Sequence, residues 1–478
     1  MRQPQGVLLP PPPNGRVRRG ELYSTLRAAV IDGVLSPGDR LPSTRRAAVD
    51  YGVSRGLMEE IFAQLTEEGF FERAVGRGTF IASEVARIEK PVRVNTRLTP
   101  SHRISRRGRA AAENAACREP DRPRAFNAGT ADTSEFPWKV WCRLQARAAR
   151  ELGRDALTFT DPRGLPELRT AIARYLAQFR GIRSTARQIV VFSSAQQALN
   201  ALAVLLLERG DTVWIEDPCY LGARAAFQLA GAVAAPVTVD VDGLVVDAGK
   251  RAAPRARMAY VTPSHQYPTG VALSLERRIE LVTWAARRDT WIVEDDYDGE
   301  FRYEGQPLAP LYSLDARERV VYMGTLNKSM YASLRLAYVV VPEDLVELLA
   351  NIRTQMDGFS PALSQMTMAS FMEEGYFASH LRRMRALYGA KRRALVEGLS
   401  PLLEHGWSCP VNPAGLHLLV RHPRGEYVRR IAASSALDLA LLSRYRIDRA
   451  RDDGLFLRYG GLDVETLRTA VRELVSAV

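Results

Sequence analysis

Lys328 stands out because lysine is scarce in this chain and because of where this lysine lies. The chain has 66 lysine and arginine residues, and only five of them are lysines. Arginine cannot replace a primary amine as a nucleophile, so a lysine in an apolar region invites a chemical explanation. Lys328 follows the apolar run VVYMGT in a polar turn, with Thr325 three residues before it and Arg335 seven residues after it. An amine at the end of a strand, followed by an arginine that can bind phosphate, indicates a functional site and not an ordinary surface lysine.

Complementary groups follow other apolar runs of the sequence. The segment TWIVEDDYDGEFRY places Asp295 and Tyr297 directly after an expected strand, and WIEDPCY ends on Tyr220. The segment SSAQQ joins a strand to a helix, so the backbone N–H groups of Ala195 and Gln196 can hold a phosphate at the helix start. In α/β folds, ligands bind at the carboxyl ends of parallel strands, and these groups can therefore surround one ligand.

Together these groups match what pyridoxal phosphate requires of a protein. The cofactor needs an amine for a Schiff base, an acid at its pyridine nitrogen, a donor to its phenolic oxygen, a phosphate cradle and a flat surface against its ring. Lys328, Asp295 and Tyr297 can supply the first three, and Arg335 and Tyr220 can contribute to the last two. Taken singly, each residue also has a plainer interpretation as a surface lysine, an acidic loop or a packing tyrosine.

The elements that must position these groups are expected to form an α/β domain with a mainly parallel sheet. From about Phe126 to the C-terminus, strand-like runs alternate with amphipathic helical stretches, which is typical of a parallel layout. The sequence contains no internal repeat, no P-loop and no Rossmann glycine fingerprint. The expected strands are 189–192, 212–216, 258–262, 290–294 and 320–323.

A smaller unit is expected ahead of this domain, at about residues 19–83. Three helical patterns precede a hairpin pattern with the glycine turn VGRG, and Ser43 or Thr44 is placed to cap the second helix. Three helices and a hairpin in about sixty residues describe a winged helix-turn-helix. The expected core stripes are Leu22, Leu26, Ala29 and Val30 in the first helix, and Leu57, Ile61 and Leu65, with Met58 and Phe62 beside them, in the third.

Basic residues lie where such a unit meets DNA. Arg45 and Arg46 open the second helix, Arg55 follows Ser54 at the start of the third, and Arg77 lies on the hairpin tip. Guanidinium groups at these places can reach base edges in the major groove and phosphates beside it. Solvated arginines are the plainer interpretation of each one, but their joint placement favours DNA binding.

Charge, composition and cysteine content agree with a DNA-binding protein of the cytoplasm. Residues 1–125 carry +8 of the net charge of +12, which favours an anionic partner for the N-terminal part. The apolar runs are too short for a membrane span, and there is no secretory signal. The four cysteines are scattered without metal-type spacing, so we expect free thiols and no metal site.

The sequence therefore divides into four parts. Residues 1–18 form a proline-rich basic arm expected to be disordered, and residues 19–83 form the winged helix-turn-helix. Residues 84–124, rich in arginine and alanine, form a linker that is flexible or partly helical. Residues 125–478 form the α/β domain.

The N-terminal unit resembles the DNA-binding domain of the GntR family over its full length. The pieces SPGDRLPSTR, YGVSR and GRGTF stand in the family's places. The resemblance implies that Arg45, Arg55 and Gly76 occupy DNA-contacting positions and that the partner is a double-stranded DNA operator.

The chain from Phe126 to Val478 resembles the fold-type I aminotransferases, and more closely the MocR subgroup of GntR regulators. The motifs are DPRGLPELRTAIARYL, EDPCY, TPSHQYPTGVALSLERR, EDDYDGEFRY and the Lys328 segment. The resemblance implies a pyridoxal-phosphate domain with a smaller C-terminal α+β subdomain, and a homodimer.

The same resemblance assigns roles to particular residues. Lys328 would form the Schiff base, Asp295 would pair with the pyridine nitrogen, and Tyr297 would bond the phenolic oxygen. Arg335 would bind phosphate and Tyr220 would stack on the ring. Arg458, in LFLRYGGL, falls where aminotransferases hold a substrate carboxylate.

Three departures from the family pattern bear on cofactor binding. Asn327 stands before the lysine where serine is usual, and Ala332 replaces a usual proline. Ser194-Ala195 stand where the helix start commonly reads Gly-Ser. The last change could weaken phosphate binding by about 1–2 kcal/mol, the worth of a hydrogen bond or so.

Three functions remain open at this point. The first is a regulator that senses an amino compound, or pyridoxal phosphate itself, through a Schiff base at Lys328. The second is a working aminotransferase with an accessory DNA-binding module. The third is a regulator whose aminotransferase-like body dimerises or binds a ligand without this chemistry. The winged helix-turn-helix favours the first over the second, and the joint presence of Lys328, Asp295 and Tyr297 favours it over the third.

Overall fold

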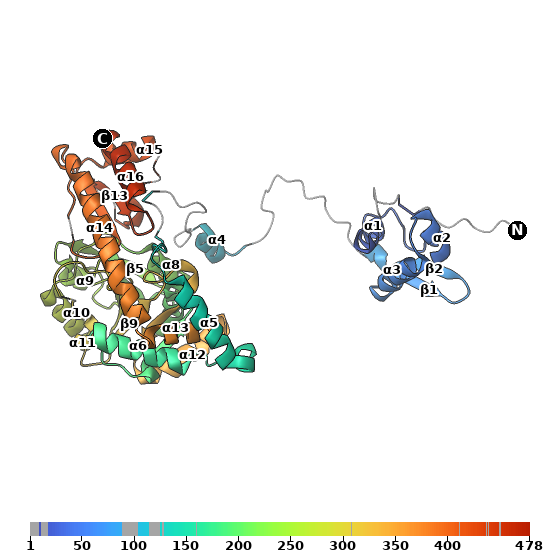
Figure 1. The fold of residues 1–478 in the computed structure, drawn as a ribbon, viewed down its shortest axis with the longest axis horizontal. Helices are drawn as coiled ribbons and strands as arrows, with labels where there is room; N and C mark the ends of the chain where they lie inside the picture. The colour runs from blue at the N-terminus through green and yellow to red at the C-terminus, as the bar shows by residue number, and fades with distance from the viewer. Residues whose placement is uncertain are drawn as a thin grey trace. The chain divides into compact units, whose positions relative to one another are not determined.

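The computed structural model describes residues 9–10, 18–87, 104–113, 125–126, 129–158, 160–306, 308–410, 412–435, 437, 439–448 and 451–478. The chain divides into two compact units, Met1–Arg103 and Ile104–Val478 (Figure 1). The predicted arm and linker lie largely outside the described residues. Of the arm, Leu9 packs against the core of the first unit, and Pro10 accepts a hydrogen bond of 2.5 Å from the hydroxyl of Tyr51.

The first unit is the predicted three-helix unit with a hairpin. The side chains of Ser43 and Ser54 accept hydrogen bonds from backbone N–H groups in the first turns of α2 and α3, which fixes where both helices begin. Phe62 of α3 packs edge-on against Phe71 of the hairpin, with 5.2 Å between ring centroids. The elements are α1 (Arg19–Ile31), α2 (Thr44–Asp50), α3 (Arg55–Glu67), β1 (Phe71–Ala74) and β2 (Gly78–Ile81).

The core of this unit confirms the predicted stripes except at one position. Leu22, Leu26, Ala29 and Val30 of α1 are buried. In α3 the buried residues are Met58, Ile61, Phe62 and Leu65, whereas Leu57 is only partly buried. The buried face of α3 is centred on the Met58 and Phe62 row, so Leu57 lies at its edge.

The second unit contains an eight-stranded mixed sheet in the order β3-β10-β9-β8-β7-β4-β5-β6. Strands β5, β4, β7, β8 and β9 run parallel, and β10 is antiparallel to both of its neighbours, as β6 is to β5. All five predicted strands are present. The bounds are β3 (Ile189–Phe192), β4 (Thr212–Asp217), β5 (Val233–Asp240), β6 (Gly243–Leu244), β7 (Met258–Val261), β8 (Trp291–Asp296), β9 (Val320–Thr325) and β10 (Ala337–Val340).

One strand boundary corrects the sequence prediction. Asp295 was expected just after its strand, but it lies within β8, opposite Met323 of β9. Backbone pairing with the parallel neighbour does not depend on side-chain polarity, so the strand continues through both aspartates. The side chain of Asp296 is stabilised inside the protein by an ion pair with Arg180 and a 2.6 Å hydrogen bond from Tyr322.

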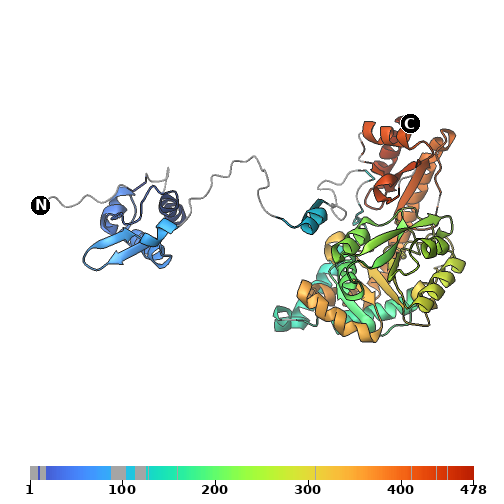
Figure 2. The same cartoon turned by 180° about the vertical axis from the view of Figure 1, so that it is seen from behind.

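Helices cover both faces of this sheet (Figure 1, and from behind in Figure 2). Apolar side chains that alternate along the strands pack against α7, α8 and α12 on one face, and against α5, α6, α13, α9 and α10 on the other. Helix α4 (Arg106–Glu113), within the predicted linker, contacts α8. The other bounds are α5 (Trp138–Leu152), α6 (Pro166–Phe179), α7 (Ala195–Leu206), α8 (Leu221–Ala230), α9 (Val246–Ala252), α10 (Leu275–Arg288), α11 (Leu311–Leu314), α12 (Glu343–Met356) and α13 (Ala362–Glu373).

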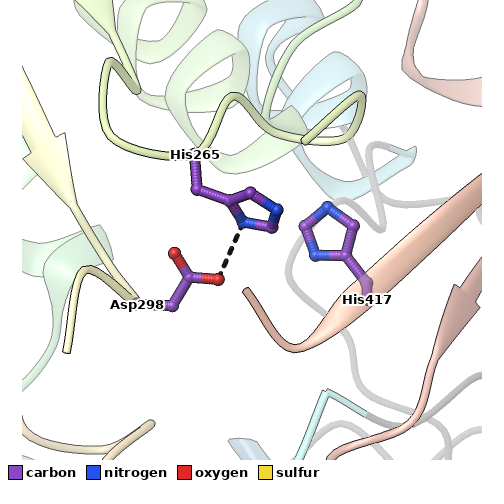
Figure 3. A group of neighbouring side chains, drawn as sticks. All are labelled: His265, Asp298 and His417. Carbon is purple, nitrogen blue, oxygen red and sulfur yellow. Dashed lines mark hydrogen bonds and ion pairs between the residues drawn. The ribbon is translucent and has the colours of Figure 1, made fainter. Parts of the chain in front are cut away.

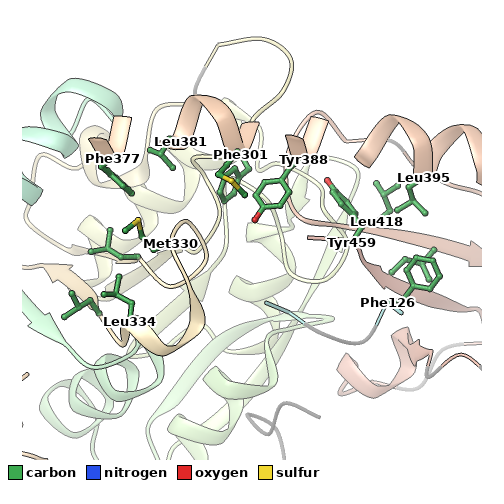
Figure 4. Close-up of a cluster of buried hydrophobic side chains, with 14 of the residues drawn as sticks. Phe126, Phe301, Met330, Leu334, Phe377, Leu381, Tyr388, Leu395, Leu418 and Tyr459 are labelled. Atoms are coloured by element: carbon green, nitrogen blue, oxygen red, sulfur yellow. The ribbon is translucent and has the colours of Figure 1, made fainter. Parts of the chain in front are cut away.

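A smaller C-terminal subdomain is joined to the sheet domain by the long helix α14 (Tyr376–Glu404). Its three strands are arranged in the order β11-β13-β12. Side chains of one continuous apolar cluster run from Met330 and Leu334, near the Lys328 loop, to Leu418 and Tyr459 of the subdomain (Figure 4). The bounds are β11 (His417–His422), α15 (Gly425–Ser434), β12 (Ala440–Leu441), β13 (Asp453–Arg458) and α16 (Val464–Ser476).

Candidate functional site

A cavity of about 1620 Å³ lies in the second unit, and β7, β8 and β9, together with the loop after β4, contribute to its wall. Tertiary folding brings together every residue that the sequence nominated for cofactor or effector binding. These residues all line the cavity: Ala195, Gln196, Tyr220, Asp295, Tyr297, Thr325, Lys328, Arg335 and Arg458.

Lys328 lies in the loop after β9, where its ammonium donates a 2.5 Å hydrogen bond to the carbonyl of Gly129. The neighbouring Asn327 accepts a 3.1 Å hydrogen bond from the backbone N–H of Leu336 through its side-chain oxygen. Thr325 accepts a 3.3 Å hydrogen bond from the N–H of Asn327. The asparagine that replaces the usual serine therefore fastens the lysine loop to the start of β10.

Asp295 presents a buried carboxylate that is only half satisfied. Its Oδ2 accepts a 2.6 Å hydrogen bond from the hydroxyl of Tyr260. Its Oδ1 is buried and has no hydrogen-bond partner among the described residues. Burial raises the pKa of Asp295 to about 7, although the Tyr260 hydrogen bond opposes that change. A protonated pyridine nitrogen would supply the missing donor and the opposite charge, so this residue fits pyridoxal phosphate.

The phosphate end of the cavity combines a guanidinium with a helix start. Arg335 has a left-handed backbone (φ 56°), and its exposed side chain makes no hydrogen bond or ion pair within the described part of the chain. Ala195 and Gln196 are the first residues of α7, whose early N–H groups point out of the helix. The hydroxyl of Ser194 accepts a 3.1 Å hydrogen bond from Gln197 as the helix cap. These groups also fit the cofactor.

Tyr297 is held by a histidine that sequence reasoning did not single out. The Tyr297 hydroxyl donates to the carbonyl oxygen of His265 and lies 3.0 Å from the same residue's Nδ1. That Nδ1 also lies 3.0 Å from Asp298, and the His417 ring stands beside it (Figure 3). Burial, and then the charge of His265, hold the pKa of His417 well below its usual value.

The His265, Asp298 and His417 side chains are donor types that also bind metals, and their ligand atoms lie within 4.8 Å of one another. The hydrogen bonds of His265 tie it to Tyr297 and Asp298, whereas the Nε2 of His417 is buried and has no hydrogen-bond partner among the described residues. The motif TPSHQYPTG, which contains His265, was the available sequence signal.

The opposite end of the cavity is aromatic and carries Arg458. Its guanidinium donates a 2.8 Å hydrogen bond to the hydroxyl of Tyr267 and lies over the ring of Phe456, 5.1 Å from the centroid. Tyr267 in turn packs edge-on against Tyr220, with 5.6 Å between centroids. Tyr267 therefore links the predicted ring-stacking residue to the predicted carboxylate site, and the sequence analysis missed it.

The predicted DNA-contacting residues are exposed on the first unit. Arg45 and Arg46 lie in the first turn of α2, Arg55 is the first residue of α3, and the exposed Arg77 lies 5.9 Å from the ring of Phe80. In the hairpin turn, Gly76 adopts a left-handed backbone with φ 72°, which favours glycine. Two of these arginines pair four residues along their helices, Arg46 with Asp50 and Arg55 with Glu59.

A winged helix-turn-helix joined to an aminotransferase fold defines a class of protein, the DNA-binding regulators with an aminotransferase-like domain. Family models agree with both halves. Bacterial regulatory proteins of the gntR family match residues 18–81, and aminotransferase class I and II matches residues 126–449. The chain belongs to the gntR family of bacterial regulators, with an aminotransferase class I and II domain.

Individual relatives match the chain over nearly their whole length. The chain is 36% identical to the probable rhizopine catabolism regulatory protein MocR of Rhizobium meliloti, over 96% of this chain and 93% of that protein. It is 32% identical to the pyridoxine biosynthesis regulator PdxR of Corynebacterium glutamicum, over 96% and 95%.

A solved structure supports the fold and the cofactor. LysN, the α-aminoadipate aminotransferase of Thermus thermophilus, solved with N-(5'-phosphopyridoxyl)-L-leucine, matches with a TM-score of 0.68 and 26% identity, over 78% of this chain and 94% of that one. The protein is thus a pyridoxal-phosphate-dependent transcription regulator that binds DNA. Among the described residues, no helix is long and apolar enough to cross a membrane.

Proposed function

We propose that this regulator senses a small amino compound, or pyridoxal phosphate itself, at Lys328. When bound, pyridoxal phosphate supplies a carbonyl carbon that condenses with primary amines and a ring that withdraws electrons. The observation that carries the proposal is the half-satisfied carboxylate of Asp295, in one cavity with the amine of Lys328 and the exposed guanidinium of Arg335.

Each residue of the cavity then has a defined task. The carboxylate of Asp295 holds a proton at the pyridine nitrogen, and Tyr260 keeps that carboxylate oriented. Arg335 and the first N–H groups of α7 hold the phosphate. Tyr297, whose hydroxyl donates to the carbonyl of His265 in this structure, would turn that O–H to the phenolic oxygen, and Tyr220 would stack against the ring. Lys328 presents the amine with which an amino effector competes.

The effector is held at its other end by Arg458. A guanidinium that is oriented by Tyr267 and backed by Phe456 favours a carboxylate or a similar planar anion. The effector can change DNA binding only if it binds one arrangement of the protein better than another. We further propose a cytoplasmic homodimer whose two DNA-binding units contact two operator half-sites.

The test compares wild-type protein with Lys328→Ala, using Lys250→Ala as the matched control because Lys250 lies on the surface and pairs with Asp247 and Glu280. Wild type and control should acquire a visible absorbance with pyridoxal phosphate, and Lys328→Ala should not. Footprinting of the DNA upstream of the protein's own gene, with and without candidate amines, should reveal two half-sites whose protection changes only in proteins that keep Lys328. An unchanged footprint in the presence of every amine, with sustained conversion of amino acids, would instead support a working aminotransferase.

A further inference from the structure

A fully buried lysine, Lys391, holds the stretch of chain that contacts the partly buried Lys328. Lys391 lies on α14 and is fully buried. Its ammonium forms an ion pair with Asp132 and donates a 2.9 Å hydrogen bond to the carbonyl of Gly460. Burying an ammonium is costly unless a carboxylate and further acceptors satisfy it, so this arrangement fixes all three segments relative to one another.

Asp132 belongs to a stretch that we call the lead-in segment, residues 125–126 and 129–134. It is anchored twice at Asp132, because the backbone N–H of that residue also donates a 2.9 Å hydrogen bond to the hydroxyl of Tyr388 on α14. Burial favours the neutral acid, but hydrogen bonds from Lys391 and Ser134 outweigh it and lower the pKa of Asp132. The carboxylate is therefore ionised and the ion pair is complete at neutral pH.

The lead-in segment contacts both residues to which the proposed function gives a sensing role. The carbonyl of Gly129 accepts the hydrogen bond from Lys328. The carbonyl of Phe126 accepts a 3.2 Å hydrogen bond from the backbone N–H of Arg458, at the end of β13. Thr130 approaches the same subdomain so closely that a Cβ at position 461 would lie 2.5 Å from its hydroxyl oxygen.

The place of the segment in the sequence gives these contacts a consequence. Residues 125–134 follow directly on the linker that leads to the winged helix-turn-helix. If a hydrogen bond that anchors the segment is lost, the position of the chain where the linker ends can therefore change.

We propose that the lead-in segment reports the state of Lys328 to the linker, and that Lys391 is the positioning residue that keeps the segment within reach. This inference rests on the proposed function of Lys328. While Lys328 carries its ammonium, it donates to Gly129 and holds the segment. When the amine is engaged with pyridoxal phosphate, it would no longer donate that hydrogen bond, and the described anchors at Asp132 and Phe126 would remain.

Hydrogen–deuterium exchange of the full-length protein tests the proposal, with peptides that cover Gly129 to Ser134 as the readout. In wild type, pyridoxal phosphate should speed exchange there about fivefold, which corresponds to the loss of one hydrogen bond. Lys328→Ala should exchange at the faster rate with or without the cofactor. Aminooxyacetate, an amine that competes with Lys328 for the cofactor carbonyl, should restore slow exchange in wild type.

Lys391→Met should exchange quickly in every state and lose the dependence on cofactor, while Lys250→Met should behave as wild type. Asp132→Asn, which removes the charge but keeps the size of the side chain, should lose at least half of the cofactor-dependent difference if Lys391→Met does not fold. A purely structural role for Lys391 would lower stability but leave the ratio between the two states unchanged, which would overturn the proposal.

The two hypotheses fail differently. If wild-type protein acquires the visible absorbance but exchange at Gly129 to Ser134 is the same with and without cofactor, the lead-in segment does not report on Lys328 and the proposed function stands. If no visible absorbance develops, the proposed function itself fails.

Discussion

At the scale of single residues, Asp295 is a buried carboxyl group that lacks one hydrogen-bond donor within the described part of the chain. Its carboxylate is fully surrounded by protein, yet one oxygen has no donor within the described residues. Burial raises its pKa to about 7. An acid that is poorly satisfied in the empty protein but matched to a protonated ring nitrogen favours the bound state.

Asp295→Asn should therefore stabilise the empty protein and weaken cofactor binding. In the folded state this carboxyl keeps its proton up to about pH 7, whereas in the unfolded chain it loses it near pH 4, so its contribution to stability falls as the pH rises through that window. The asparagine does not titrate. Its advantage should grow from pH 5 to pH 8 by about 2.5 kcal/mol.

Thermal unfolding of cofactor-free protein at the two pH values measures the first effect, and titration with pyridoxal phosphate measures the second. The comparison is made against wild type because Glu216, Glu294 and Glu300 are also buried with pKa values raised to about 7. A variant that loses stability at pH 8 would contradict this account of Asp295.

At the scale of elements, the end of β4 fastens the C-terminal subdomain to the sheet domain. The carboxylate of Asp217, the last residue of β4, accepts hydrogen bonds from the N–H groups of Ile447 and Asp448, at 2.8 and 3.0 Å. The N–H of Cys219 donates to the carbonyl of Tyr445, at 2.9 Å. The segment that contains Ile447 and Asp448 also carries Tyr445, which lines the cavity beside Arg458.

Asp217→Ala should destabilise the protein by about 1–3 kcal/mol, since two N–H groups lose their acceptor. It should also weaken the effect of an amino effector on DNA binding, because the loop near Arg458 loosens. Asp448→Ala is the control, as it removes an exposed carboxyl and keeps the N–H that Asp217 binds. Chemical denaturation of the three proteins compares their free energies of unfolding. Equal losses of stability in both variants would contradict this role of the Asp217 hydrogen bonds.

In the winged helix-turn-helix, Glu59 near the start of α3 competes with DNA phosphate for the guanidinium of Arg55. Glu59 accepts a 2.8 Å hydrogen bond from Arg55 one turn along the exposed face. Glu59→Gln should raise DNA affinity about two- to fivefold at low salt, because it frees the guanidinium and removes a charge that repels phosphate. Fluorescence anisotropy with an operator duplex at two salt concentrations measures this, with Arg55→Gln expected to lower affinity. A gain that persists at high salt would point to a different cause.

At the scale of the whole molecule, the two units have separate cores. The apolar cluster of the first unit contains only residues up to Val85 among those described, whereas the cofactor cavity is built wholly from residues 129–460. Ligand binding stabilises the unit that contains the site, by about 2.7 kcal/mol at a hundredfold excess over the dissociation constant.

Scanning calorimetry should therefore resolve two unfolding transitions, and pyridoxal phosphate should raise only that of the larger unit. Lys328→Ala should reduce this rise, while the transition of the smaller unit stays in place. Equal shifts of both transitions would mean that the two units unfold together.

Much of this architecture was predictable because it depends on patterns among residues that are close in the sequence. The cap of α2 at Ser43, the apolar periodicity of α1 and the five strands depend on local patterns, and the structure confirmed them. The strand before Tyr297 was predicted to end at residue 294, two residues too early, because a pair of aspartates is typical of a loop, although pairing with β9 continues β8 to Asp296.

The sequence alone determined the types of residue available for chemistry and the strand ends at which they stand, since amine, acid and guanidinium are properties of single side chains. Tertiary structure decided which partners they have. Tyr260 beside Asp295, His265 beside Tyr297, and Lys391 beside Asp132 are contacts between residues 32 to 259 positions apart. Such contacts depend on how layers pack and on burial, which sets the charge state of Asp295, and no local pattern in the sequence encodes them.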